Sequence, residues 1–138
     1  MKKIYLVFIP FLFLLLAACK KEKPDSYDNL LAKGTWELVQ SWTPNYPDPG
    51  FVDGYLTFQA GGNCEYKDKN GNMYYGTWDQ NWQSDFETHS LYIDVTNPIT
   101  RERKFEYYED IQFSSGYQFN AYIYVTYTPC VFTFRLKT

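Results

Sequence analysis

The chain has 138 residues, of which 13 are basic and 16 acidic, and its formal net charge is −3. This length predicts one folded domain with a sizeable core. Proteins that bind nucleic acid cluster lysines and arginines against the phosphates, so the acidic balance excludes nucleic acid as a partner. Aromatic residues make up 21 % of the chain, and their preference for strands indicates a β-rich fold.

The first 18 residues have the order of a secretory signal peptide. Lys2 and Lys3 form a short basic region, an apolar run covers residues 4–16, and the small residues Ala17-Ala18 follow it. The run is shorter than the ~20 residues that span a bilayer, which favours a cleaved leader over a membrane helix. We therefore predict that residues 1–18 are removed and that the rest of the protein lies outside the cytoplasm.

The stretch Leu16-Ala17-Ala18-Cys19 resembles the bacterial lipobox. In that family the signal is cut before the cysteine, which then carries a diacylglyceryl group and a further acyl chain such as palmitate. The resemblance implies that Cys19 is the lipid attachment site, and two or more acyl chains anchor a protein stably. It implies a lipoprotein of the cell outer membrane, facing the periplasm or the surface, with residues 19–26 as a charged tether. The alternative is an ordinary signal peptide that happens to end in cysteine.

After a short helical turn, apolar and polar residues alternate along the sequence with a period of two. We expect the turn over residues 27–33, with Ser26 as its cap and Gly34 at its end. Beyond it, apolar and polar side chains alternate, which is typical of half-buried antiparallel strands. Runs of glycine, asparagine and proline separate the alternating segments as turns. The pattern predicts eight strands over residues 35–42, 54–59, 63–68, 73–79, 90–96, 103–113, 117–127 and 130–137.

Eight strands joined mainly by hairpins predict an all-β, up-and-down antiparallel barrel over residues 27–138. Closure into a barrel removes exposed strand edges. A sandwich of two sheets is the alternative. An eight-stranded barrel has an interior just wide enough to be filled by side chains or to hold one small ligand.

The first strand opens on the tripeptide Gly34-Thr35-Trp36. A helical turn followed by Gly-x-Trp resembles the start of lipocalin-type barrels. Together with the lipobox and the tether, it resembles the small lipocalin-like lipoproteins of Bacteroidetes-type bacteria. The resemblance implies structural roles for Gly34 and for Trp36, which closes the narrow end of such barrels. The tripeptide recurs as Gly76-Thr77-Trp78, where a glycine before an inward tryptophan leaves room for a closely approaching strand.

The sequence predicts that the protein is not an enzyme and uses no metal or cofactor. The single histidine, His89, lies at the edge of a predicted strand, and no cysteine or histidine pair has metal-ligand spacing. Cys64 and Cys130 have no neighbours that would activate a thiol. In an eight-strand meander these two cysteines lie near opposite ends, so we expect them to be unpaired.

The predicted strand 103–113 carries a carboxylate among its apolar residues. Phe105, Tyr107, Ile111 and Phe113 alternate along this strand, and we expect their side chains to point into the interior. Glu109 has the same parity, and a buried carboxylate must find partners. One interpretation is a polar group that orients a ligand. The other is a bulge between Tyr108 and Asp110 that turns Glu109 to solvent.

The aromatic residues near the two long connections, 42–53 and 79–88, are the strongest indication of a binding function. Tyrosine and tryptophan make good contact surfaces because they are amphipathic and have few rotamers. Outward parity is predicted for Tyr55, Tyr92, Tyr108, Tyr122 and Tyr124. The alternative is that outward tyrosines merely suit the surface of a strand. The candidate ligand-binding residues are Trp42, Tyr46, Trp78, Trp82 and Tyr107.

Two functions fit these observations. The barrel could bind a small apolar or amphipathic ligand, with the long connections at its mouth. Alternatively, a filled domain could be a non-enzymatic interaction module that docks an envelope protein or a glycan through its Tyr- and Trp-rich loops. An enclosed cavity above ~300 Å³ would distinguish the first from the second.

Overall fold

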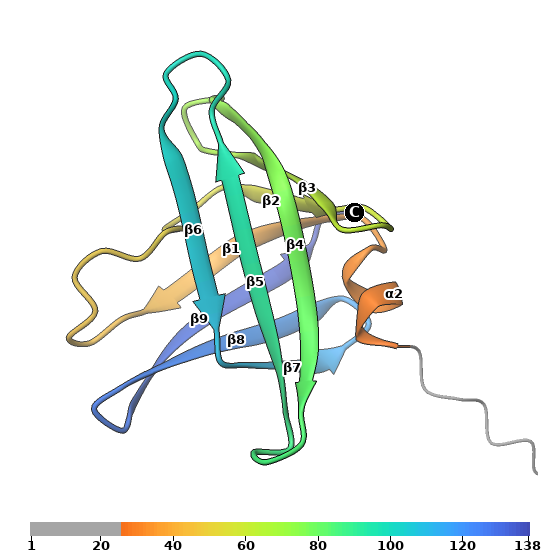
Figure 1. Cartoon of the computed structure of the whole chain (residues 1–138), viewed down its shortest axis with the longest axis vertical. Coiled ribbons are helices and arrows are strands. Elements are labelled where there is room, and N and C mark those ends of the chain that lie inside the picture. Colours follow the sequence, from red (N-terminus) through yellow and green to blue (C-terminus); the bar gives the residue numbers. More distant parts are fainter. Residues whose placement is uncertain (1–25) are drawn as a thin grey trace, which may run out of the picture.

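The computed structural model of the chain describes residues 26–138 (Figure 1). The predicted signal peptide 1–18, the lipid attachment site Cys19 and the tether up to residue 25 lie outside the described residues. Within the described part, no helix has the length and apolar character of a membrane span.

Nine strands form one antiparallel sheet within residues 26–138. They are β1 (Thr35–Trp42), β2 (Tyr55–Phe58), β3 (Asn63–Lys67), β4 (Met73–Gln83), β5 (Thr88–Thr96), β6 (Arg103–Tyr108), β7 (Asp110–Ser115), β8 (Gln118–Val125) and β9 (Thr128–Leu136). Their order across the sheet is β6-β5-β4-β3-β2-β1-β9-β8-β7. The all-β, antiparallel prediction is confirmed, and the first strand pairs with the last.

The sheet is not closed into the predicted barrel. Its two edge strands, β6 and β7, follow each other in the chain and are linked by Glu109 alone. The sequence predicts one strand over residues 103–113, but β6 pairs with β5 whereas β7 pairs with β8. This division gives nine strands instead of eight. The two edges of the sheet therefore meet at a corner around Glu109, which we call the seam.

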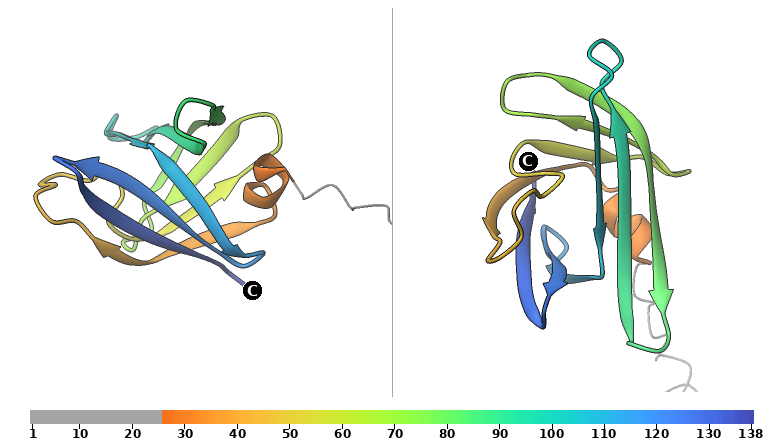
Figure 2. Two further views of the ribbon diagram at one scale, coloured as in Figure 1. Left: turned by 90° about the horizontal axis from the view of Figure 1, so that it is seen from below. Right: turned by 60° about the vertical axis from the view of Figure 1, so that its left-hand side comes forward.

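The sheet curls so that its two halves face each other across one core (Figure 2). The ring of Tyr108 on β6 packs against Phe132 on β9, with 5.2 Å between ring centroids. Trp36 on β1 packs against Phe119 on β8 at 4.9 Å. The largest wholly buried aromatic side chains are Trp36, Phe51, Phe58, Tyr74, Tyr108, Phe119, Phe132 and Phe134. Large aromatic rings thus occupy the space between the two halves.

One short helix, α2 (Tyr27–Leu31), precedes the first strand and packs on one end of the core. Ser26 caps it, because its hydroxyl accepts a hydrogen bond from the backbone N–H of Asn29 at 3.3 Å. The last turn is tied to β1, since Nε1 of Trp36 donates to the carbonyl of Leu31 at 2.8 Å. The prediction of a short helical turn before the first strand is confirmed.

The inward face of β6 is the opposite of the predicted one. Phe105 and Tyr107 are 57 % and 46 % exposed, whereas Glu106 and Tyr108 are buried. The prediction, which placed Phe105 and Tyr107 inside and Tyr108 outside, was wrong for this strand. The loop between β1 and β2 donates hydrogen bonds to the carboxylate of Glu106, which makes its burial tolerable. Glu109 is exposed and belongs to no strand, in agreement with the interpretation that a break turns it to solvent.

The two Gly-Thr-Trp segments meet different surroundings. A Cβ atom at Gly76 would lie 1.9 Å from the carbonyl oxygen of Asp94 on the neighbouring strand β5, which confirms the predicted close approach. A Cβ atom at Gly34 would meet only the end of the Leu136 side chain, at 3.2 Å. Both glycines precede an inward tryptophan, but only Gly76 is required by the backbone of a partner strand.

Candidate ligand-binding site

The five predicted ligand-binding residues do not form one site. Trp42 and Trp82 are half exposed, as is Tyr107, on different strands. Trp78 is buried, and Tyr46 is half-buried against the core. Trp78, Tyr107 and Tyr46 each line a different pocket, together with residues from other elements.

Tyr107 lines a pocket of about 440 Å³ at the seam. The other lining residues are Gln83, Phe86 and Thr88 of the β4–β5 hairpin, Glu109 of the link between β6 and β7, and Tyr124 of β8. We call this the seam pocket. In Figure 1 the β4–β5 hairpin extends below the corner at which the chain leaves β6 for β7.

The seam pocket exists because β5 extends beyond β6. β5 begins at Thr88, but β6 ends at Tyr108, which pairs with Leu91. The chain then turns away at Glu109, whose backbone N–H donates to the carbonyl of Tyr122 on β8 at 2.8 Å. Side chains from both halves of the sheet therefore converge beside the seam.

Aromatic walls and one free carboxylate give the seam pocket its chemistry. Phe86 is 78 % exposed, and Tyr107 and Tyr124 are 46 % and 45 % exposed. The exposed carboxylate of Glu109 forms no ion pair and no side-chain hydrogen bond within residues 26–138. Burial is the main cause that raises the pKa of Tyr124, and the negative charge of Asp110 raises it further. Its hydroxyl therefore stays neutral at physiological pH. The pocket thus offers three neutral rings beside one negative charge.

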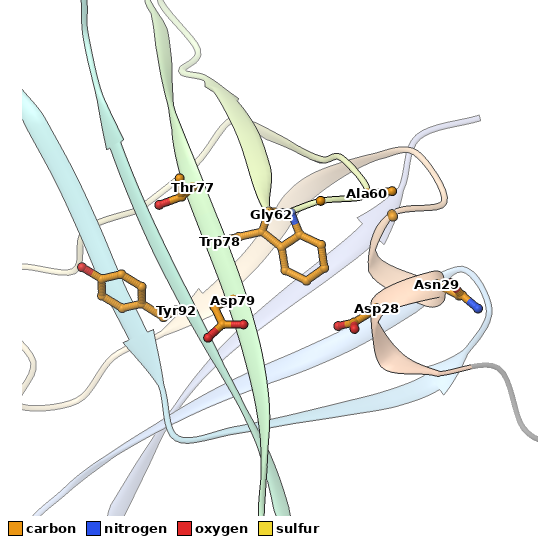
Figure 3. Close-up of a pocket in the computed structure, with 10 residues that line it drawn as sticks. Asp28, Asn29, Ala60, Gly62, Thr77, Trp78, Asp79 and Tyr92 are labelled. Carbon is orange, nitrogen blue, oxygen red and sulfur yellow. The ribbon is translucent and has the colours of Figure 1, made fainter.

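A second pocket, of about 590 Å³, lies between α2 and the sheet, and we call it the helix–strand pocket (Figure 3). Figure 3 shows the carboxylates of Asp28 and Asp79 on opposite sides of it. Trp78 contributes little surface, because its ring packs on Phe58 at 5.2 Å and its Nε1 donates to the carbonyl of Gln59 at 3.0 Å. Only 7 % of Trp78 remains exposed. The other aromatic residue of this pocket, Tyr92, is half-buried. The pocket therefore has fewer exposed aromatic side chains than the seam pocket.

Tyr46 serves to fasten the loop between β1 and β2 onto the edge strand β6. The buried carboxylate of Glu106 accepts hydrogen bonds from the Tyr46 hydroxyl and from the backbone N–H of Gly50, each at 2.8 Å. Burial and the hydrogen bond to Glu106 raise the pKa of Tyr46 to about 12. At Gly50 the loop lies so close to β6 that a Cβ atom would overlap the carbonyl of Phe105. The loop thereby covers part of an otherwise free strand edge.

Trp82 lies in β4 and not in a long connection. The sequence predicts a connection over residues 79–88, but β4 and β5 stay paired up to a short turn at residues 84–87. The Trp82 ring packs on His89 with 4.8 Å between centroids, and His89 packs on Tyr27 of α2 at 3.8 Å. This stack of three rings joins α2 to the β4–β5 hairpin.

We expect the domain to lose stability as the pH falls below about 6.5, the usual pKa of histidine. Burial lowers the pKa of His89, although Asp110 and Asp28 oppose the shift. The unfolded chain therefore binds the proton first, so the stability due to neutral His89 is complete above pH ~6.5 and declines toward the lowered pKa. Melting temperatures measured between about pH 7.5 and 5.5 should fall more for the native chain than for His89→Gln. Identical slopes would show that another group is responsible.

The thiols and the acidic groups form no metal-binding cluster within residues 26–138. No group of three or more His, Cys, Asp or Glu side chains in this range could hold a metal ion. Cys64 and Cys130 are free and buried, as predicted. Burial raises the pKa of Cys64 to about 12 and also raises that of Cys130, so both thiols stay protonated and unreactive. They act as small core residues.

Comparison of the chain with protein-family models, curated proteins and solved structures finds no match. Sequence reasoning singles out Tyr107 and considers Glu109, but it does not single out Phe86 as part of a site. The outward parity of Tyr124 is visible in the sequence. Its proximity to Tyr107 is not, because the two residues belong to strands that do not pair.

Proposed function

We propose that the protein is a non-enzymatic lipoprotein of the cell envelope that binds one small amphipathic ligand in the seam pocket. The observation that carries this proposal is that Phe86, Tyr107, Tyr124 and the acidic residue Glu109 line one pocket of about 440 Å³. Ligand pockets of this size usually combine aromatic walls with a few polar groups that fix the orientation of the ligand. The rings would bind the apolar part of the ligand, and the carboxylate would orient its polar part.

The ligand is assigned to the seam and not to the interior of the sheet because core side chains occupy that interior. The seam pocket and the helix–strand pocket are both open to solvent. The sequence predicts a ligand inside a barrel, whereas we propose a ligand in a pocket at the surface of the sheet. We propose that the fold is a lipocalin-like barrel that stays open between β6 and β7, since the sheet is curled and its first and last strands pair.

We further infer that Cys19 carries a lipid anchor in the outer membrane. The support is the lipobox-like stretch that ends at Cys19 and the apolar run before it. Residues 20–26 separate Cys19 from α2, and at ~3.3–3.6 Å per residue they span at most about 25 Å. An anchor at Cys19 would hold the domain, and with it the seam pocket, near the membrane surface.

A second candidate function, the docking of an envelope protein or a glycan, is favoured by the turn between β8 and β9. Thr126 and Tyr127 have φ angles of 48° and 65°, a left-handed conformation that is costly for residues other than glycine. The Tyr127 side chain is 98 % exposed. The turn thus presents an exposed aromatic ring at a hairpin tip with non-glycine residues in a strained conformation, which supports a contact role for Tyr127.

Titration with N-phenyl-1-naphthylamine, an uncharged fluorescent amphiphile, tests the seam pocket. We expect a saturable rise in fluorescence with the native chain and about tenfold weaker binding to Tyr107→Ala, which corresponds to about 1.4 kcal/mol. Tyr75→Ala is the matched control, because Tyr75 is also half exposed (49 %) but does not line the pocket. Equal affinities of the two variants would contradict the assignment of the site.

A further inference from the structure

We propose that the ligand of the seam pocket carries a positively charged alkylammonium head group. This inference rests on the proposed function of the pocket and specifies the chemical class of its ligand. The geometry that points to it is that Glu109 lines the same pocket as the three aromatic residues Phe86, Tyr107 and Tyr124.

The negative charge at the seam pocket has no counter-ion from the described chain. The ion pairs within residues 26–138 are Arg103–Asp94 and Lys104–Glu102. Neither pair includes a residue that lines the pocket, and none of the lining residues is a lysine or an arginine. Beside Glu109, the buried side chain of Asp110 adds a second carboxylate at the seam. A bound cation would supply the charge that the protein lacks at this position.

Three aromatic rings provide the second requirement for binding an organic cation. The face of an aromatic ring is electronegative and attracts a cation within ~6 Å of its centroid, above all a weakly hydrated alkylammonium group. Phe86, Tyr107 and Tyr124 come from a hairpin, β6 and β8, so their rings approach the pocket from different elements. Tyr124 is further oriented by stacking on Tyr122, with 6.4 Å between centroids.

The same surroundings select against the other classes of small ligand. An anionic head group would be repelled by Glu109, and no basic side chain lines the pocket to offset that repulsion. An uncharged ligand could use the rings and could donate a hydrogen bond to the carboxylate, but it would lack the Coulomb attraction between opposite charges. Charge, at constant size and shape, is therefore the property that the test must vary.

Choline and 3,3-dimethylbutan-1-ol provide that comparison, because the alcohol replaces the quaternary nitrogen by carbon and keeps the shape. Binding can be followed through backbone amide NMR shifts in residues 83–88 and 107–109. We expect choline to bind the native chain at least about tenfold more tightly than the alcohol. Glu109→Gln should bring the two affinities to within about twofold, and added salt should weaken the binding of choline only.

Glu65→Gln is the matched control, since it removes one acidic charge from β3, outside the seam pocket. It should leave the preference for choline unchanged. Equal binding of choline and the alcohol to the native chain would overturn the charge selection and leave the pocket itself intact. A preference for choline that persists in Glu109→Gln would equally overturn the proposal. If neither compound binds while N-phenyl-1-naphthylamine does, the cation proposal alone fails; if none of the three binds, the proposed function fails with it.

Discussion

Replacing Trp36 by alanine should remove a large part of the stability of the domain. The side chain is wholly buried, packs against Phe119 and Phe113, and donates its Nε1–H to the carbonyl of Leu31. Truncation of such a tryptophan costs about 3–5 kcal/mol, compared with a total of about 5–15 kcal/mol for a typical domain. In β1, Trp36 also pairs with Leu136 of the last strand, so its truncation weakens the packing between the first and the last strand. Urea unfolding should show the loss as a lowered midpoint.

Trp82→Ala is the matched control for Trp36→Ala. Trp82 is 53 % exposed and loses only its stacking on His89, so we expect a cost within about 1 kcal/mol. If Trp82→Ala were the more destabilising of the two, the assignment of Trp36 to the core and of Trp82 to the surface would be wrong. Trp36 would then have to be reconsidered as a functional contact.

Replacing Gly76 by alanine should also destabilise the domain strongly, by overpacking. The new Cβ atom would lie 1.9 Å from the carbonyl oxygen of Asp94 and 2.8 Å from the Cα atom of Val95. Both obstacles are backbone atoms of β5, which is paired with β4 from Tyr75 to Gln83, so neither strand can yield locally. We expect a loss of about 3 kcal/mol, near the upper end of typical overpacking effects. Equilibrium unfolding measures it.

Gly34→Ala tests whether the backbone contact, and not the loss of a glycine, causes the effect. Gly34 opens the same tripeptide, but its Cβ atom would meet only Cδ1 of Leu136, at 3.2 Å. A side-chain end can shift by a few tenths of an ångström, and the reduced freedom of the unfolded chain favours alanine. We expect a change within about 1 kcal/mol. Similar losses in both variants would mean that the close approach of β5 is not the cause.

Local pattern predicted most of the fold because the alternation of side chains directly reflects the two faces of a strand. β1 has the predicted bounds, and the turn before it is the predicted helix. The exception is the stretch 103–113, where two physical facts lie beyond alternation. Glu106 is buried because a distant loop supplies its hydrogen bonds, and the chain changes its partner strand at Glu109. Neither the loop contact nor the change of partner is encoded in a local period.

The candidate site was less predictable than the fold because its walls belong to strands that are not neighbours in the sheet. Tyr107 on β6 and Tyr124 on β8 meet only through the curl of the sheet at the seam. Trp78 is of a residue type that often binds ligands, but its ring packs on Phe58 in the core. The aromatic composition therefore indicated a binding surface, but the position of that surface depends on which strands the fold brings together.

Mapping the bound uncharged amphiphile by backbone amide NMR tests the central claim most directly. With N-phenyl-1-naphthylamine at saturation, we predict that the largest shifts lie in residues 83–88 and 107–109 and at Tyr124. Core residues such as Phe58 and Phe132 should change little, because their surroundings are already filled. Largest shifts centred on those core residues, with the seam unaffected, would contradict the claim and return the ligand to the interior of the sheet.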